Sequence, residues 1–211
     1  STFVDLDNSL VLWMRMDERK NSTYVYDNSS YDNHGSAYGD AAYTPYGKLG
    51  DGFSFDGAGD YVGLQSEGGY GGNMTQCVWI KTNSVSDNCV VSYQNEYNGV
   101  SHDKQIYINT DGKPAYYVYN GGQSHATGTT TLLIGVWYFL CGTVDSSVGN
   151  SIWVNSINES TNSDGTASAL FAGSFFIGAK TKDTDSFSDK DFNGSIDDVI
   201  IFNRSLSAAE I

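Results

Sequence analysis

The sequence has few basic residues. Lys and Arg total 11 against 25 Asp and Glu, so the net charge at pH 7 is −14. Nucleic acids and anionic membrane surfaces are bound through fields of Lys and Arg. We therefore exclude nucleic acid as a partner and keep cations and neutral ligands. The acidity alone does not show that cations are bound, because a strongly charged surface also keeps a protein soluble.

Long hydrophobic stretches are missing too. No apolar run reaches the roughly 18 residues of a membrane-spanning helix, and the first residues, STFVDLDNS, are too polar for a signal peptide. We expect no direct membrane insertion. A chain of 211 residues fits one β-sandwich. Because it does not begin with Met, we expect residues 1–211 to be a single domain cut from a longer extracellular protein.

Helical periodicity is almost absent. Instead, short runs of β-branched and aromatic residues recur between Gly, Asn and Asp, which is typical of strands. The expected strands are 10–16, 53–64, 74–82, 89–93, 104–109, 114–119, 136–144, 151–155, 175–179 and 195–203. This pattern predicts an all-β protein built as a two-sheet antiparallel sandwich.

Turn sequences predict two hairpins. In FSFDGAGDYV (53–62), the Asp-Gly and Ala-Gly steps supply positive φ between two alternating halves. NTDGKP (109–114) is expected to join the strands on either side of it. The segments 18–50 and 156–172 are expected to be long polar loops, where binding sites usually lie. Only SLSAAEI, at the end, predicts a short helical turn, with Ser207 as its N-cap and Glu210 at the third position.

Acceptor sequences for N-glycosylation, N-x-[ST], occur at Asn21, Asn28, Asn73, Asn158, Asn193 and Asn203. Several arise by chance in a chain so rich in Asn, Ser and Thr. Together with the acidity and the cysteines, they favour an extracellular or cell-surface location.

A series of motifs runs along nearly the whole chain: LVLWMRMDE, GKLGDGFSFDGAGDYV, VWIKT, GVWYFLCGTVD, SIWVN and FNGSIDDVIIFNRSLSAAEI. Their order resembles the laminin-G-like and pentraxin-like jelly rolls of the concanavalin A-like lectin/glucanase superfamily. The resemblance implies a jelly roll of two antiparallel sheets. It also implies an extracellular binding module of the kind attached to adhesins, receptors or glycan-processing enzymes.

Catalytic motifs are missing. The superfamily includes glucanases whose E-x-D-x-x-E motif places two carboxylates about 5 Å apart, but none of the five Glu here is followed two residues later by Asp. No H-E-x-x-H or G-x-S-x-G pattern occurs. We therefore expect a protein that is not an enzyme.

Three cysteines, Cys77, Cys89 and Cys141, allow at most one intramolecular pair. The runs around Cys77 and Cys141 resemble the pentraxin strands that carry that family's single disulfide, which implies this pair. The alternative is that both are reduced core residues. Cys89 is expected to be a buried free thiol, because no neighbouring Lys, Arg or His suggests a lowered pKa.

The resemblance also implies a structural Ca²⁺ ion, which would be bound by oxygen ligands. An Asp at the start of the last strand commonly holds this ion, and Asp197 matches it here. Its expected partners are Asp17, Asp27 and Asn33. The alternative is that these are ordinary turn residues. Strand alternation predicts that Asp197 and Asp198 point to opposite faces.

A second Ca²⁺ site would lie in a loop. FFIGAKTKDTDSFS resembles the pentraxin loop that binds ligand through calcium, with Asp183 and Asp185 in ligand positions and Asp103 contributed from an earlier segment. Lys104 departs from the pattern, because an ammonium group cannot ligate a cation. The alternative is a solvated acidic loop.

Tyrosines and asparagines crowd the central strands and suggest a surface for sugar rings. The expected ligand-binding residues are Tyr93, Tyr97, Asn98, Tyr117 and Tyr119. Alternation places Tyr117 and Tyr119 on one face and Tyr116 on the other, so about half of this cluster is expected in the core.

These observations favour a Ca²⁺-stabilised extracellular binding or adhesion module, with a glycan or a cell-surface glycoprotein as its partner. Two alternatives remain. One is a self-associating structural subunit of a surface layer or filament. The other is an accessory domain of a glycan-degrading enzyme.

Overall fold

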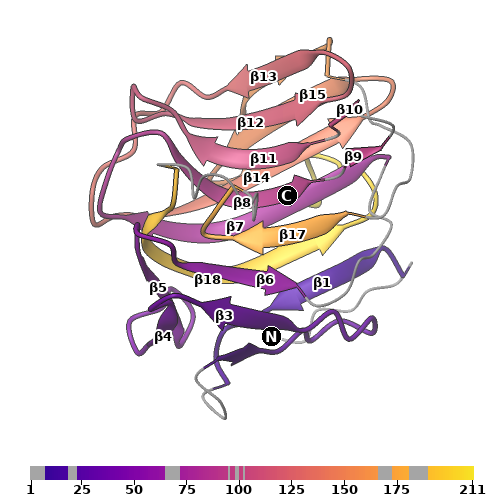
Figure 1. The fold of residues 1–211 in the computed structure, drawn as a ribbon. Helices are drawn as coiled ribbons and strands as arrows, with labels where there is room; N and C mark the ends of the chain where they lie inside the picture. Colours follow the sequence, from indigo (N-terminus) through magenta and orange to yellow (C-terminus); the bar gives the residue numbers. More distant parts are fainter. Residues whose placement is uncertain are drawn as a thin grey trace.

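A computed structural model describes residues 8–18, 23–64, 72–94, 96–97, 100–101, 103–165, 173–180 and 190–211. Within these ranges two antiparallel sheets pack face to face (Figure 1), which confirms the expected all-β sandwich. The described residues contain no helix that is long and apolar enough to cross a membrane.

Sheet A has the strand order β16-β15-β14-β7-β18-β5-β4, and β1 also pairs with β18. Its strands are β1 (Leu10–Met14), β4 (Ala42–Thr44), β5 (Gly52–Asp56), β7 (Met74–Thr82), β14 (Trp137–Asp145), β15 (Gly149–Val154), β16 (Ile157–Asn162) and β18 (Asn193–Phe202). Because β7 and β18 lie at its centre, they are buried for most of their length.

Sheet B has the order β13-β12-β11-β8-β17-β6-β3-β2. Its strands are β2 (Tyr24–Val25), β3 (Gly35–Tyr38), β6 (Tyr61–Leu64), β8 (Asn88–Gln94), β11 (Lys104–Ile108), β12 (Pro114–Tyr119), β13 (Gln123–Thr127) and β17 (Ser174–Ile177). A separate two-stranded pair consists of β9 (Glu96–Tyr97) and β10 (Val100–Ser101).

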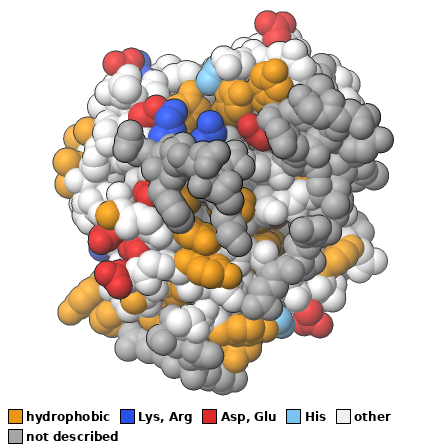
Figure 2. Space-filling model, in the orientation of Figure 1, with side chains coloured by type: hydrophobic (Ala, Val, Ile, Leu, Met, Phe, Trp, Pro, Cys, Tyr) orange, Lys and Arg blue, Asp and Glu red, His pale blue; other side chains and the backbone are white. Residues whose placement is uncertain are grey.

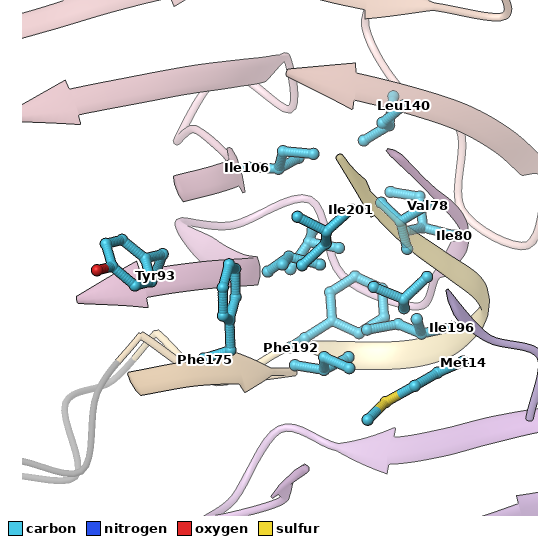
Figure 3. Packing of buried hydrophobic residues seen from close by; sticks show 14 of the residues in the cluster. Met14, Val78, Ile80, Tyr93, Ile106, Leu140, Phe175, Phe192, Ile196 and Ile201 are labelled. Atoms are coloured by element: carbon cyan, nitrogen blue, oxygen red, sulfur yellow. The ribbon is translucent and has the colours of Figure 1, made fainter. Parts of the chain in front are cut away.

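The core lies between the sheets and follows from strand alternation. In β7, Val78 and Ile80 are fully buried while Trp79 between them is partly exposed. Side chains from both sheets meet in this layer (Figure 3). Tyr116 of sheet B lies against Gly142 of sheet A, where an added Cβ would come within 2.1 Å of the tyrosine ring. The missing side chain at Gly142 therefore makes room for a large residue from the opposite sheet.

One of the two predicted hairpins is wrong. β5 pairs with β4 and β18 in sheet A, whereas β6 pairs with β3 and β17 in sheet B. The turn between them therefore crosses from one sheet to the other. The buried Asp60 fixes this crossing, because its carboxylate accepts hydrogen bonds from the N–H groups of Asp40 and Asp56. Positive φ at Gly57 and Gly59 marks a tight turn but does not decide which sheet the next strand joins.

The second hairpin is confirmed. β11 and β12 pair in antiparallel register, and the N–H of Asn109 donates to the carbonyl of Lys113 at 2.9 Å. Two other expectations need correction. The predicted loop 18–50 contains β2, β3 and β4, and the predicted loop 156–172 contains β16.

The expected helical turn at the C-terminus is a hydrogen-bonded turn rather than a helix. The N–H of Glu210 donates to the carbonyl of Ser207 at 3.0 Å, and the Glu210 carboxylate accepts from the N–H and the hydroxyl of Ser207. The two residues thus contact each other as a capping pair, but the segment is too short to continue as a helix.

Candidate binding groove on sheet B

A groove of about 390 Å³ lies on the outer face of sheet B, above β8, β11, β12 and β13. Pairing of three adjacent strands places Gln105, Tyr117 and His125 in one row across its floor. Tyr107 and Gln123 flank this row. Their neighbours Ile106, Tyr116 and Ala126 point into the core, so alternation directs the row toward the groove. Gln105 lies at the base of the groove and is only 5% exposed.

The aromatic side chains of the groove hold one another in place. The hydroxyl of Tyr107 lies 2.8 Å from Nδ1 of His125, within hydrogen-bond distance. The ring of Tyr117 lies 4.8 Å from the His125 ring and 6.5 Å from the nearly parallel ring of Tyr119. These contacts fix the positions of the groove's aromatic rings before a ligand binds.

Tyr107, Tyr117 and His125 are neutral at pH 7, and their surroundings favour the neutral forms. Burial, followed by the charge of Asp103, raises the pKa of Tyr117 to about 12. Burial, followed by Asp87, also raises the pKa of Tyr107. Partial desolvation, followed by the charge of Lys190, lowers the pKa of His125. The groove therefore offers hydroxyl donors and a neutral imidazole next to two amide side chains.

One wall of the groove is charged. The ammonium of Lys190 forms an ion pair with Asp87 at 2.7 Å, and Lys180 lines the same wall. Cys89 lies beneath them, and burial raises the pKa of its thiol to about 12. Cys89 is thus a buried free thiol, as expected, and it stays protonated. Basic side chains gather at one point of the face drawn in Figure 2.

The structure shows which of the tyrosines expected to contact a ligand are exposed and which are buried. Tyr117 and Tyr119 are partly exposed on one face and Tyr116 is buried on the other, which confirms the expected alternation. Tyr93 was wrongly expected at the surface. It is only 1% exposed and packs against Phe175 in the core, at 5.0 Å between ring centres. The side chain of Tyr97 and all of Asn98 lie outside the described residues.

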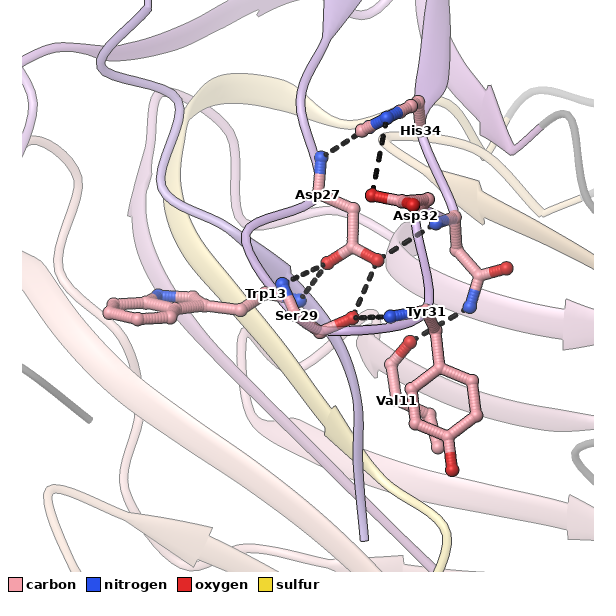
Figure 4. Close-up of polar contacts among 8 residues, drawn as sticks. Val11, Trp13, Asp27, Ser29, Tyr31, Asp32 and His34 are labelled. Carbon is pink, nitrogen blue, oxygen red and sulfur yellow. Dashed lines mark hydrogen bonds and ion pairs between the residues drawn. The ribbon is translucent and has the colours of Figure 1, made fainter. Parts of the chain in front are cut away.

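The four residues expected to bind a structural calcium ion, Asp197, Asp17, Asp27 and Asn33, form hydrogen bonds within the protein. Both oxygens of Asp27 are used, by the N–H groups of Trp13, Ser29 and Asn33 and by the Ser29 hydroxyl (Figure 4). The side-chain amide of Asn33 donates to the carbonyl of Val11. These contacts connect the 27–33 turn to β1.

The carboxylates of Asp197 and Asp17 also accept hydrogen bonds from backbone N–H groups. One oxygen of Asp197 accepts from the N–H groups of Lys48 and Leu49, at 2.7 and 2.9 Å. Asp17 accepts from the N–H of Asp51 and pairs with Arg15 at 2.7 Å. Burial raises the pKa of Asp197 to about 6 even though these hydrogen bonds favour its charged form.

A Ca²⁺ ion would compete with these hydrogen bonds, because it is bound by the same carboxylate oxygens. Each oxygen of Asp27 accepts two hydrogen bonds, whereas each oxygen of Asp17 accepts one. In the part of the chain that the structure describes, no group of three His, Cys, Asp or Glu side chains could hold a metal ion. The structural calcium ion therefore stays a prediction without support from these contacts.

Simple alternation also fails at Asp197 and Asp198. The strand register shifts between Asp197 and Ile200, and Asp198 has a φ of 46°. Such a bulge redirects side chains. Both carboxyl groups are buried, and Asp198 accepts a hydrogen bond from the indole N–H of Trp13 at 3.0 Å.

The second expected calcium site falls mostly outside the described residues, which exclude Asp183 and Asp185. Asp103 is described, and it precedes β11. Beside it, burial lowers the pKa of Lys104 to about 8, while the charge of Asp103 acts in the opposite direction. The Lys104 ammonium lies 5.1 Å from the ring centre of Tyr93. A cation is thus already present next to Asp103.

The cysteines and sequons can also be located. Cys77 and Cys141 lie directly opposite each other on β7 and β14 and form a disulfide, the pair that the resemblance implied. Among the sequon asparagines, Asn21 lies outside the described residues, Asn73 and Asn193 are partly exposed, and the others are exposed, namely Asn28, Asn158 and Asn203.

Several groove residues were not predicted from the sequence. QSHAT (123–127) has only one β-branched residue, Thr127, and no Val, Ile, Phe, Tyr or Trp, so β13 and its His125 were missed. Lys180 and Lys190 reach the groove from segments far away in the sequence. Gln105 and Tyr107, which were not predicted, did carry a usable signal, because they lie two apart on an expected strand.

Comparison with known proteins places this geometry in context. The family model Laminin_G_3, described as concanavalin A-like lectin/glucanases superfamily, matches residues 56–211. No curated protein sequence matches the chain.

Solved structures share the fold at low identity. Domain 4 of the extracellular GH43 arabinanase AbnA from Geobacillus stearothermophilus, solved with arabinotriose, has a TM-score of 0.75 at 16% identity, with 96% of each chain covered. A SAP-like pentraxin from Limulus polyphemus has a TM-score of 0.62 at 14% identity, with 74% of this chain and 77% of that one covered.

The binding domain of Paraclostridial Mosquitocidal Protein 1 has a TM-score of 0.73 at 12% identity. That match covers 96% of this chain and 51% of that structure. Identities this low show a shared fold, and the family match covers well over half of the sequence. This chain therefore belongs to the concanavalin A-like lectin/glucanase superfamily.

Proposed function

We propose that this protein is a non-catalytic carbohydrate-binding module of an extracellular or cell-surface protein, and that it binds a glycan in the groove of sheet B. The observation that carries the proposal is the row formed by Gln105, Tyr117 and His125. Sugars present alternating apolar ring faces and hydroxyl groups. A fixed aromatic ring beside amide, hydroxyl and imidazole groups complements both.

Two further observations support this proposal. The groove groups are neutral at pH 7 and fixed by one another, so little side-chain freedom is lost when a ligand binds. In addition, a protein with the same fold, the arabinanase domain, was solved with a bound arabinotriose.

A glycan array followed by calorimetric titration with the best glycan tests the proposal. Tyr117→Ala removes the central ring and should weaken binding about tenfold or more, equivalent to about 1.4 kcal/mol. Tyr46→Ala is the matched control, because Tyr46 is 72% exposed and does not line the groove. Unchanged glycan affinity in a folded Tyr117→Ala protein would contradict this location, and a blank array would contradict the function.

Calcium is not used in this proposal, because none of the groove contacts described above requires it. Thermal melting with Ca²⁺ and with a chelator tests the separate expectation of a stabilising ion. A melting temperature that rises with Ca²⁺ supports that ion, since a ligand of the native state stabilises it. An unchanged melting temperature argues against it.

A further inference from the structure

The charged wall of the groove differs from the rest of the protein. The chain carries a net charge of −14. Among the described residues that line the groove, however, Lys180 and Lys190 are basic and only Asp87 is acidic. Counted over the described residues, the groove lining therefore has an excess of one positive charge in a strongly acidic protein.

Both lysines face the floor of the groove. Both line the groove together with Cys89. The carbonyl of Lys190 accepts from the N–H of Cys89 at 2.7 Å, and the carbonyl of Lys180 accepts from the Ser92 hydroxyl at 2.7 Å, so both lysines are held against β8. Lys190 also acts on His125, which belongs to the row of ligand-facing side chains. The two positive charges thus lie beside the proposed sugar contacts.

The two lysines differ in their ion pairs within the protein. Lys190 is paired with Asp87, whereas Lys180 makes no ion pair within the described part of the chain. A ligand carboxylate could accept from Lys180 and share Lys190 with Asp87. Charge-assisted hydrogen bonds of this kind are stronger than those between neutral groups.

We propose that the groove binds an anionic sugar, with Lys180 and Lys190 contacting its carboxylate or sulfate group while the sugar ring lies beside Tyr117. This inference rests on the proposed function and adds the chemical class of the glycan. Outside the groove, the acidic surface repels anions. Selectivity for the charged sugar therefore comes from these two lysines.

Calorimetric titration with three probes tests the proposal: a uronic acid trisaccharide, the same trisaccharide with its carboxyl groups reduced to alcohols, and a sulfated disaccharide. We expect the uronic acid to bind roughly tenfold more tightly than its reduced form. Lys180→Gln combined with Lys190→Gln should abolish this preference. Binding of the sulfated probe that also depends on the two lysines would assign sulfate as an accepted group, and sulfate binding that ignores them would overturn the role of the lysines.

The matched control is Lys48→Gln combined with Lys81→Gln. These lysines lie beside Trp79 and Trp137 on sheet A, and their replacement changes the net charge by the same amount. The control should keep the preference. Equal affinity for the charged and reduced trisaccharides, or a preference that survives in the Lys180/Lys190 variant, would overturn the proposal.

Asp87→Asn provides a second, independent test in case the double variant does not fold. It frees Lys190 from its ion pair and should tighten binding of the uronic acid about threefold without changing that of the reduced sugar. Weaker or unchanged binding of the uronic acid would count against the proposal. If Tyr117→Ala abolishes binding of the neutral sugar while all lysine variants have no effect, the anionic class fails and the proposed function stands. If no sugar binds, both fail.

Discussion

The outer faces of the two sheets carry grooves of similar size, about 390 Å³ on sheet B and 410 Å³ on sheet A, with very different linings. The sheet B groove is lined by tyrosine, histidine, amide and charged side chains. The groove on sheet A is mostly apolar, with Trp13, Trp79 and Phe139 among its walls. All four tryptophans of the chain lie on sheet A strands at partly exposed positions.

The two grooves differ in how many of their polar groups already contact other residues of the protein. On sheet A, the Trp13 indole donates to Asp198, and Lys48 lies 4.6 Å from the ring centre of Trp79. On sheet B, Gln105 and Lys180 line the groove, and the side-chain nitrogen of Gln105 has no hydrogen-bond partner among the described residues. Exposed aromatic residues alone are thus a weak guide to a glycan site. Polar groups that remain available beside a fixed ring are a better one.

The largest expected effect comes from the disulfide of sheet A. Cys77→Ala with Cys141→Ala should lower the free energy of unfolding by about 2–4 kcal/mol, because the bond closes a separation of 64 residues. Urea denaturation measures this loss. Glycan affinity at a temperature where the variant is folded should not change, since the bond lies on β7 and β14 of the opposite sheet. A parallel loss of affinity would show that the faces are coupled.

A change between the two layers should affect both faces. Gly142→Ala places a methyl group against the Tyr116 ring and should cost about 1–3 kcal/mol. Because Tyr116 lies on β12 next to Tyr117, glycan affinity should fall as well. Gly122→Ala is the control, since nothing lies within 4 Å of an added Cβ there. Equal stability of the two variants would contradict the tight contact between the layers.

The hydroxyl of Tyr116 allows a smaller test of the same contact. It is buried and has no hydrogen-bond partner among the described residues. Tyr116→Phe should therefore leave stability unchanged or raise it by up to about 1 kcal/mol. Tyr138→Phe is the control and should lose about 1 kcal/mol, because the Tyr138 hydroxyl accepts from the N–H of Leu133 at 3.2 Å. Thermal and urea unfolding measure both, and a clear loss in Tyr116→Phe would reveal a missed partner.

Much of the fold could be predicted because most strands carry a strong local pattern. LVLWM and MTQCVWIKT contain enough apolar and β-branched residues to predict β1 and β7. The β5–β6 turn was misread because pairing across sheets depends on contacts distant in sequence. Asp60, which fixes that turn, looks like any other aspartate in the sequence.

The site was harder to predict than the fold. The sequence could show that Tyr117 and Tyr119 share a face, since alternation is local. It could not show that His125 lies beside Tyr117, because that depends on the pairing of β12 with a strand of weak propensity. Nor could it show that the carboxylate of Asp27 accepts hydrogen bonds from three backbone N–H groups. Metal ligands and turn aspartates share the same residue types, and only geometry separates them.

The smallest expected effect is the pH response of His125. Tyr107 and Tyr117 contact its ring, and partial desolvation with the nearby charge of Lys190 lowers its pKa. The unfolded chain then binds a proton more readily than the folded one, so stability from this group falls as pH drops below about 6.5. His125→Gln should flatten this dependence between pH 7 and 5, as followed by urea unfolding. A bound carboxylate opposes Lys190 and should raise the pKa of His125, which NMR titration with and without the uronic acid can measure; a pKa that stays the same or falls would place the anion away from the row.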